Sequence, residues 1–282
     1  APVTQQNMMA IQLNQRVVGL IEEKMAAGES VMLTLAVSPG MAMGGVNALA
    51  DLVEPWGLRP QLDRIVFRQQ LGPTDEKVPA REHFITEWPT GENASPMTRA
   101  VSGMRGLSVL ASPIARTDPV PESVTLYPLI ELTRTGAADL ALWAETNLAS
   151  AEPSPDPEEV AESFTIGYAA ESEAGRLVVI ADPAFGDDAI TNAAIMGGQI
   201  VPDAAPLFGA GFPANLEVMT NSIVWLAGHD ELIAAGARTQ AVRRIGEVSE
   251  RSMVGLQIFI LAGLPLVIVA SGVGVWLVRR NG

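Results

Sequence analysis

The spacing of apolar residues in the first 240 residues switches between helical and extended periods. Apolar side chains from Met8 to Met25 recur on one helical face, so the pattern predicts a helix over Gln5–Ala27 that ends at Gly28. The unbroken apolar run Val31–Val37 predicts a buried strand. The same patterns predict strands at Asp63–Arg68, Leu107–Ala111, Ser123–Leu129, Phe164–Ala170 and Arg176–Ala181, and helices at Gly45–Val53, Ala137–Thr146, Ala214–Ala227 and Glu231–Ser249.

Strands that alternate with helices are typical of α/β folds, in which helices connect parallel strands. We therefore expect a mostly parallel sheet with flanking helices, in which the β-branched run Leu177–Ala181 is central. The proline- and acid-rich segment Glu152–Glu159 predicts an exposed loop. This loop divides the body into a first α/β portion, residues 1–150, and a second portion, residues 151–237, that completes the sheet.

The most hydrophobic segment lies at the C-terminal end. No charged residue occurs between Arg251 and Arg279, and about 20 apolar residues are enough for a helix to cross a bilayer. We predict one transmembrane helix at 253–278, preceded by a juxtamembrane amphipathic helix at 238–252 and followed by a short basic tail at 279–282. A buried core helix is the alternative, but such helices rarely lack a polar face over this length.

Five residues of this segment have expected roles in anchoring the chain. Trp276, Arg279 and Arg280 would lie at the bilayer interface, where aromatic and basic residues gather. Pro265 would kink the helix, and Gln257 would be its one strongly polar side chain. The expected arrangement is a single pass through the inner (cytoplasmic) membrane at the C-terminus, with the lipid bilayer as a partner.

Composition and charge exclude several classes of function. The 282 residues include no cysteine, which excludes disulfides, thiolate nucleophiles and thiol-bound metals. The two histidines, His83 in a polar loop and His229 after a helix end, cannot by themselves form a typical zinc site. The net charge of −14 opposes contact with a phosphate backbone, so no nucleic acid partner is expected.

Carboxylates follow the strand that we expect to be central. Asp182, Asp187 and Asp188 lie at its carboxyl end, where open α/β sheets bind their ligands. Three carboxylates could hold Mg²⁺ or Ca²⁺, but Asp-Pro and Gly-Asp are also ordinary turn sequences. We favour the turn interpretation, so no metal and no cofactor is predicted. The glycine-rich Gly40–Gly45 matches no phosphate-binding motif, and no serine-hydrolase motif is present, so no catalytic residue is predicted.

Four stretches of the chain share an order and spacing with a known family. They are Met25–Gly28 with Val31–Val37, Leu49–Leu58 with Asp63–Val66, Ser95–Arg99 with Leu126–Thr133, and Gly175–Phe185 with Asn215–Gly228. Together they resemble the GldG-like auxiliary components of ABC-type transport systems, named for bacterial gliding motility. The last pair is the most specific, because it resembles a Gly-Arg-strand-Asp motif followed by Asn, Asn and Trp-Leu at fixed spacing. Asp182, Asn215 and Asn221 occupy these positions.

The resemblance implies an extracytoplasmic body that works beside an ABC permease and ATPase. It also implies a fold related to the glutamine-amidotransferase-like, or flavodoxin-like, α/β layer, whose enzymes use a cysteine that this chain lacks. We therefore expect a non-catalytic, membrane-anchored auxiliary subunit that contacts substrate or partner proteins, with self-association as a further partner hypothesis. The alternatives are an envelope scaffold without a transport role and a carboxylate-dependent hydrolase. Candidate binding residues are Asp182, Asp187, Asp188, Asn215 and Asn221.

Overall fold

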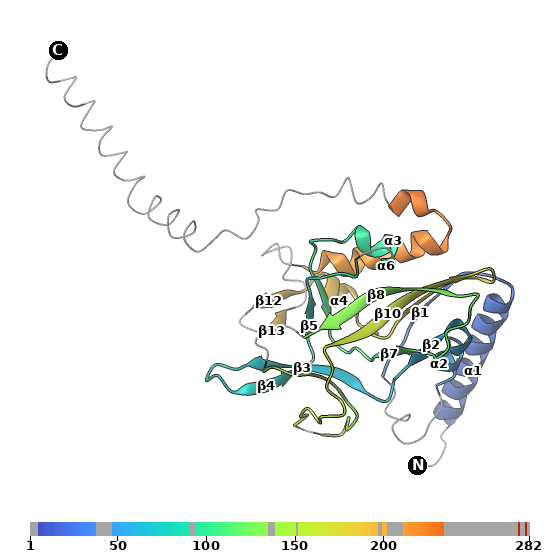
Figure 1. The fold of residues 1–282 in the computed structure, drawn as a ribbon, viewed down its shortest axis with the longest axis horizontal. Helices are drawn as coiled ribbons and strands as arrows, with labels where there is room; N and C mark the ends of the chain where they lie inside the picture. The colour runs from blue at the N-terminus through green and yellow to red at the C-terminus, as the bar shows by residue number, and fades with distance from the viewer. Residues whose placement is uncertain are drawn as a thin grey trace. The chain divides into compact units, whose positions relative to one another are not determined.

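The computed structural model describes residues 5–37, 47–90, 94–134, 139–150, 152–196, 199–201 and 211–233, together with Trp276 and Arg280. The chain divides into two compact units, residues 1–238 and residues 239–282, which are considered separately. The strands and helices discussed below belong to the first unit (Figure 1).

A four-stranded mixed sheet forms the centre of the first unit. Its order is β1 (Val31–Thr34), β11 (Gly175–Ile180), β10 (Ser163–Ser172) and β8 (Thr125–Thr133). Strands β1 and β11 are parallel, whereas β11–β10 and β10–β8 are antiparallel pairs. Strands from both predicted portions of the body, residues 1–150 and 151–237, therefore share one sheet.

The expectation of a mostly parallel α/β sheet is wrong, and the connection between β10 and β11 gives the reason. Ser172 pairs with Gly175, so two residues join the strands. A parallel connection needs a crossover of a dozen or more residues, so this link can only be a hairpin. The run from Leu177 to Ile180 resembled a parallel strand because β11 lies between two neighbours and these four residues are fully buried.

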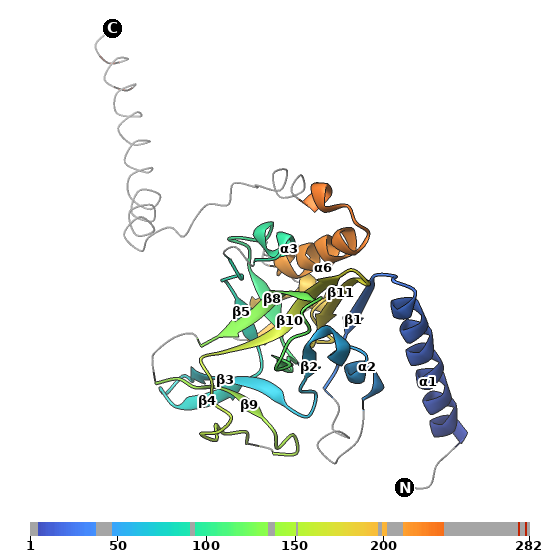
Figure 2. The same ribbon diagram turned by 45° about the vertical axis from the view of Figure 1, so that its right-hand side comes forward.

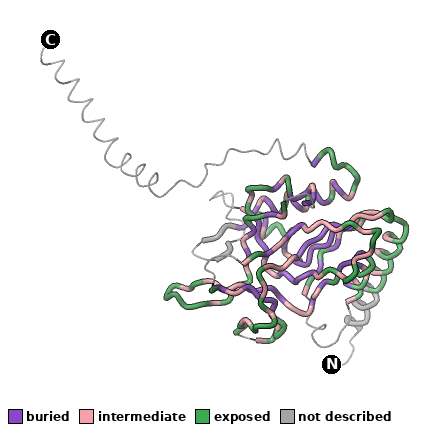
Figure 3. Tube along the Cα trace, viewed as in Figure 1, coloured by how far each residue is buried: buried purple, intermediate pink, exposed green. Residues whose placement is uncertain are grey.

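Helices cover both faces of the four-stranded sheet. Alternate side chains of β11 point to opposite faces, so Val178 and Ile180 join one core cluster, and Leu177 and Val179 join the other. The first cluster includes residues of α6 (Pro213–Leu226) and α3 (Pro96–Arg99). The second includes residues of α1 (Gln5–Ala26), α2 (Ala48–Asp51) and the 3-10 turn η2 (Glu54–Trp56). Figure 2 shows α6 and α1 on different sides of the sheet, and Figure 3 shows the buried strands between them.

Four smaller antiparallel sheets surround the central one. They join β2 (Leu58–Pro60) to β7 (Ile114–Arg116), β3 (Ile65–Leu71) to both β4 (Lys77–Ala80) and β9 (Leu142–Glu145), β5 (His83–Ile85) to β6 (Gly106–Ser108), and β12 (Ala194–Met196) to β13 (Gln199–Val201). The short helix α4 (Asp188–Thr191) follows β11.

The helix expected at Ala137–Thr146 is replaced by the strand β9. Its residues pair with β3, and the ring of the fully buried Trp143 stacks on that of Phe67 with a centroid distance of 5.4 Å. The alanines of this segment favour a helix locally, but pairing and ring packing with a distant strand override that preference.

No helix among the described residues is long and apolar enough to cross a membrane. The predicted transmembrane helix at 253–278 and the inner-membrane location are corrected accordingly, because no described helix supports them. Gln257, Pro265 and Arg279 lie outside the described residues, as does the predicted helix at 238–252. Trp276 is half-exposed, with the Arg280 guanidinium carbon 5.2 Å from its ring centroid.

Candidate functional site

Asp182 lies two residues after the end of β11, and its side chain is completely buried. Its Oδ2 atom accepts hydrogen bonds from the Ser108 hydroxyl at 2.6 Å and the Val109 N–H at 3.0 Å. Its Oδ1 atom accepts one from the Ala184 N–H at 2.9 Å. Both oxygens are therefore engaged in the interior, where they connect the end of β6 to the turn after β11, and a substrate has no access to them.

Asn215, near the start of α6, forms a second connection to β6. Its Oδ1 atom accepts from the Leu107 N–H at 2.9 Å, and its Nδ2 atom donates to the Leu107 carbonyl at 2.7 Å. Nδ2 also donates to the Phe185 carbonyl at 2.8 Å. The fully buried amide thus pairs with both backbone groups of Leu107, as a neighbouring strand would, and positions α6 on the sheet.

The other candidate carboxylates occupy turn positions. Asp187 accepts the Ala189 N–H at 2.7 Å and caps α4, and Asp188 begins that helix; both are exposed. Within the described ranges, no group of three or more histidine, aspartate and glutamate side chains is placed to hold a metal ion. The structure therefore does not gather Asp182, Asp187 and Asp188 into one cation site.

Asn221 lies on the buried face of α6, with a relative exposure of 5%. Its Nδ2 atom has no hydrogen-bond acceptor among the described residues. It also lies outside the lining of the two open sites described below. The two asparagines of the family-like motif therefore differ: Asn215 is fully bonded, whereas Asn221 is buried and incompletely bonded.

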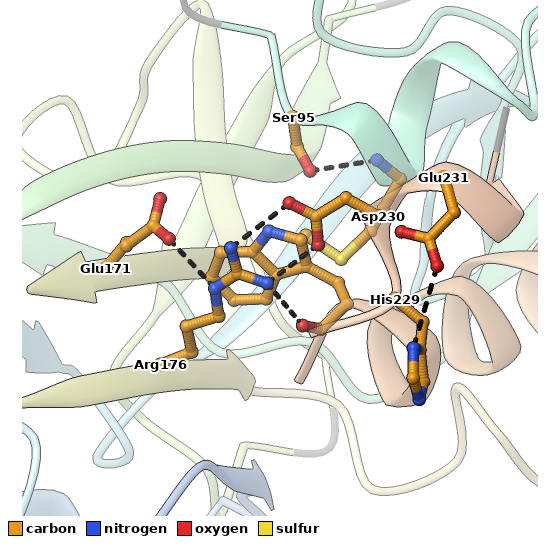
Figure 4. A network of polar contacts seen from close by, with 8 residues as sticks. Ser95, Glu171, Arg176, His229, Asp230 and Glu231 are labelled. Carbon is orange, nitrogen blue, oxygen red and sulfur yellow. Dashed lines mark hydrogen bonds and ion pairs between the residues drawn. The ribbon is translucent and has the colours of Figure 1, made fainter. Parts of the chain in front are cut away.

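Arg176 contacts several polar groups, although the sequence motifs predicted no role for it. Its guanidinium pairs with Asp230 through two hydrogen bonds, at 2.7 and 3.1 Å, and with Glu171 at 2.8 Å. It also donates to the Trp225 carbonyl at 2.6 Å and lies over that ring, 4.7 Å from its centroid (Figure 4). Hydrogen bonds to Asp230, then to Glu171, raise its pKa against the opposing effect of burial. Arg176 therefore fastens the end of α6 to the β10–β11 hairpin.

The two histidines have different environments. His229 follows α6 and is exposed, with Nδ1 3.7 Å from a carboxylate oxygen of Glu231 (Figure 4). His83 was expected in a polar loop but lies in β5 with 4% exposure, and its Nε2 atom is 3.0 Å from the Val66 carbonyl. A carbonyl only accepts, so Nε2 carries the proton. Burial lowers the pKa of His83 to about 4, so the ring is neutral in the fold.

Stability should fall as the pH drops from 6.5 toward 4, because unfolded His83 binds a proton that the folded ring excludes. The expected loss is about 3 kcal/mol at roughly 1.4 kcal/mol per pKa unit. Denaturant unfolding of the protein and of His83→Gln across this range isolates the histidine, since glutamine can still donate to Val66. Parallel pH profiles for the two proteins would contradict the prediction.

The described surface has open sites at α1 and between β5 and β8. The α1 groove, about 650 Å³, is lined mainly by residues of α1, α2 and η2, including Val18, Met25 and Trp56. The β5–β8 pocket, about 260 Å³, is lined by Arg68, by residues 83–87 and by residues 131–134. Neither includes any of the five candidate binding residues that the sequence suggested.

Comparison with known proteins adds no relative from which a role could be transferred. No family model matches the chain, and no curated protein and no solved structure shows significant similarity to it.

Proposed function

We propose that the first unit is a non-catalytic auxiliary component of an ABC-type transport system and acts by binding the transporter's ATPase or permease subunits. The resemblance of its four ordered motifs to GldG-like proteins supports the class of system. The observation that carries a binding role is that α1 both lines an open groove and exposes apolar side chains to solvent.

Helix α1 presents apolar residues on two sides. Ile21 and Met25 pack into the core, whereas Val17 and Leu20 are 45% and 55% exposed. Residues three apart are neighbours on a helix, so Val17 and Leu20 form one apolar patch on the solvent side of α1, and neither residue lines the groove. Exposed apolar patches are typical of protein-binding surfaces.

The charge at the groove indicates the chemistry of the partner. Glu22 and Asp51 line it, and neither forms an ion pair with the part of the chain that the structure describes. An apolar surface flanked by two unpaired carboxylates is complementary to a partner segment that combines apolar and basic residues. We therefore place the contact with the transporter subunit at α1.

The arrangement of Asp182 favours this binding role over a carboxylate-dependent hydrolase. A general acid or base must reach the proton that it transfers. Both oxygens of Asp182 accept hydrogen bonds inside the protein, so these hydrogen bonds would have to break before the carboxylate could act as an acid or base.

The test is co-purification of the transporter subunits with the tagged full chain and its Leu20→Lys variant. A buried hot-spot contact contributes about 2 kcal/mol or more, so the variant should recover at least about tenfold less ATPase and permease. Leu216→Lys on α6 is the matched control, because Leu216 is 57% exposed and undergoes the same substitution.

The possible outcomes separate the hypotheses. Recovery of neither subunit by the unmodified chain would overturn the proposed function, and specific capture of other envelope proteins instead would favour the scaffold alternative. Equal recovery by the unmodified chain and Leu20→Lys, or loss with Leu216→Lys alone, would reject α1 as the contact surface.

A further inference from the structure

The β5–β8 pocket combines three segments that are distant in the sequence. Arg68 belongs to β3, residues 83–87 continue through β5, and residues 131–134 end β8. Figures 1 and 2 both show β5 beside the end of β8. The volume of about 260 Å³ lies below the roughly 300–1,000 Å³ of sites for drug-sized ligands, so an occupant would be small.

Arg68 supplies a positive charge to this pocket, and no carboxylate of the described residues forms an ion pair with it. Its Nε atom donates to the Glu82 carbonyl at 2.5 Å, and its Nη2 atom donates to Gln70 Oε1 at 2.9 Å. Within the described part of the chain, Arg68 pairs with no carboxylate, and its Nη1 atom has no acceptor. Burial lowers the pKa of Arg68, and the charge of Glu82 opposes this only in part.

Partial burial of a guanidinium that has no carboxylate partner is unusual, because the charge loses solvation free energy without compensation. Phe84 holds the group in place, with the Arg68 guanidinium carbon 5.5 Å from its ring centroid. The Nε and Nη2 bonds fix the plane of the guanidinium. Its orientation is therefore set before any ligand enters, which reduces the ordering that binding requires.

The opposite wall offers backbone groups and a hydroxyl. The Arg134 N–H donates toward β10, to the Glu162 carbonyl at 2.9 Å. Because antiparallel strands alternate the direction of their backbone groups, those of Thr133 point away from β10, toward the outer edge of β8. Thr133 is exposed and lines the pocket, as does Thr86 after β5, so two hydroxyls are available beside Arg68.

The remaining charges limit the ligand to a single negative charge. Arg134 already pairs with Glu162 at 2.8 Å, so it adds little free positive charge. Glu87 and Glu131 also line the pocket, although Glu131 accepts from the Ser163 hydroxyl at 2.6 Å. A phosphate dianion would meet Glu87, Glu131 and the charge of Glu82 with one guanidinium to offset it, whereas a carboxylate brings a single charge and can accept from the free Nη1–H groups of Arg68.

The negative charge of the whole chain does not prevent such binding. The net charge is −14, but charges farther away than about 8 Å are largely screened at physiological ionic strength. The local balance at Arg68 therefore decides which ion enters.

We propose that the β5–β8 pocket binds a small monocarboxylate, whose carboxylate oxygens accept hydrogen bonds from Arg68 and from the hydroxyl or backbone groups of Thr86 and Thr133. The site is separate from the α1 groove, so it stands whether or not the transporter role is correct.

Titration of the full chain with sodium butyrate tests the site, with sodium phosphate and sodium chloride compared at equal ionic strength. NMR should show saturable shifts of the Arg68 Nε–H signal and of the Thr86 and Thr133 amide signals with butyrate. The Thr86→Glu variant places a fixed carboxylate in the pocket without altering Arg68, so it should raise the butyrate Kd by about tenfold or more.

Thr220→Glu is the matched control, because Thr220 is exposed on α6 and the change of charge is the same. Its butyrate Kd should stay within about twofold of that of the unmodified chain. Shifts that are equal for chloride and butyrate, tighter binding of phosphate than of butyrate, or an unchanged Kd in Thr86→Glu would each overturn the proposal.

Discussion

Replacing Asp182 by alanine should lower the free energy of unfolding by about 3–5 kcal/mol, the largest effect that we expect from a single substitution in this protein. The side chain is fully buried and accepts three hydrogen bonds. Alanine would leave the Ser108 hydroxyl and the Val109 and Ala184 N–H groups without their acceptor. Donors that are buried and unbonded lose their solvation without compensation, which makes such sites costly.

Denaturant unfolding monitored by circular dichroism measures this loss. Asp182→Asn should be less harmful than Asp182→Ala, because the amide keeps one acceptor oxygen. Asp188→Ala is the control, since Asp188 is exposed at the start of α4, and its effect should stay within about 0.5 kcal/mol. Equal stability of Asp182→Ala and Asp188→Ala would show that the buried hydrogen bonds do not support the fold.

Replacing Arg176 by alanine should lower the free energy of unfolding by about 2–3 kcal/mol. The change removes the hydrogen bonds to Asp230, Glu171 and the Trp225 carbonyl, together with the contact on the Trp225 ring. Surface ion pairs contribute little when long side chains must be ordered for one contact. Here one guanidinium, whose side chain is 21% exposed, serves several partners at once.

Arg176→Lys separates charge from geometry, because lysine cannot form the two-pronged contact with Asp230. Its stability should lie between those of Arg176→Ala and the unmodified protein in denaturant unfolding. Lys24→Ala is the control: it removes an exposed ion pair to Glu29 and should change stability by less than about 1 kcal/mol. If Arg176→Ala were as mild as Lys24→Ala, the guanidinium would not hold α6 to the hairpin.

Local patterns predicted many individual elements because their causes are local. The apolar period predicted α1 almost residue for residue, and Gly28 after it has a positive φ of 79°, as expected for a glycine that ends a helix. The helix predicted at Ala214–Ala227 is confirmed as α6, and its Trp225 is buried in the core. These features depend on side chains within one or two turns of each other.

The pairing of strands was not predictable in the same way. The residues from Leu177 to Ile180 do not indicate which strand will pair with them or in which direction that strand will run. A strand buried on both faces has the same apolar character whether its partners are parallel or antiparallel. The two-residue link to β10 was present in the sequence, and its length was the signal that should have indicated a hairpin.

The roles of the candidate residues depended on contacts across long stretches of chain. The carboxylate of Asp182 meets a serine 74 positions away, and Asn215 bonds a backbone 108 positions away. The order of the motifs singled out both residues. It did not indicate that their hydrogen bonds lie inside the protein. Arg68 was overlooked because a single arginine in a strand carries no pattern.

The amino-acid sequence alone established the acidic charge, the absence of thiol chemistry, and the helices and buried strands whose periodicity arises from neighbouring residues. Tertiary structure settled the direction of the strands, the change of residues 142–145 from predicted helix to strand, and the difference between the bonded carboxylate of Asp182 and the unpaired guanidinium of Arg68. The reason is physical: periodicity records which face of a segment avoids water, whereas hydrogen-bond partners and burial depend on which distant segment covers that face.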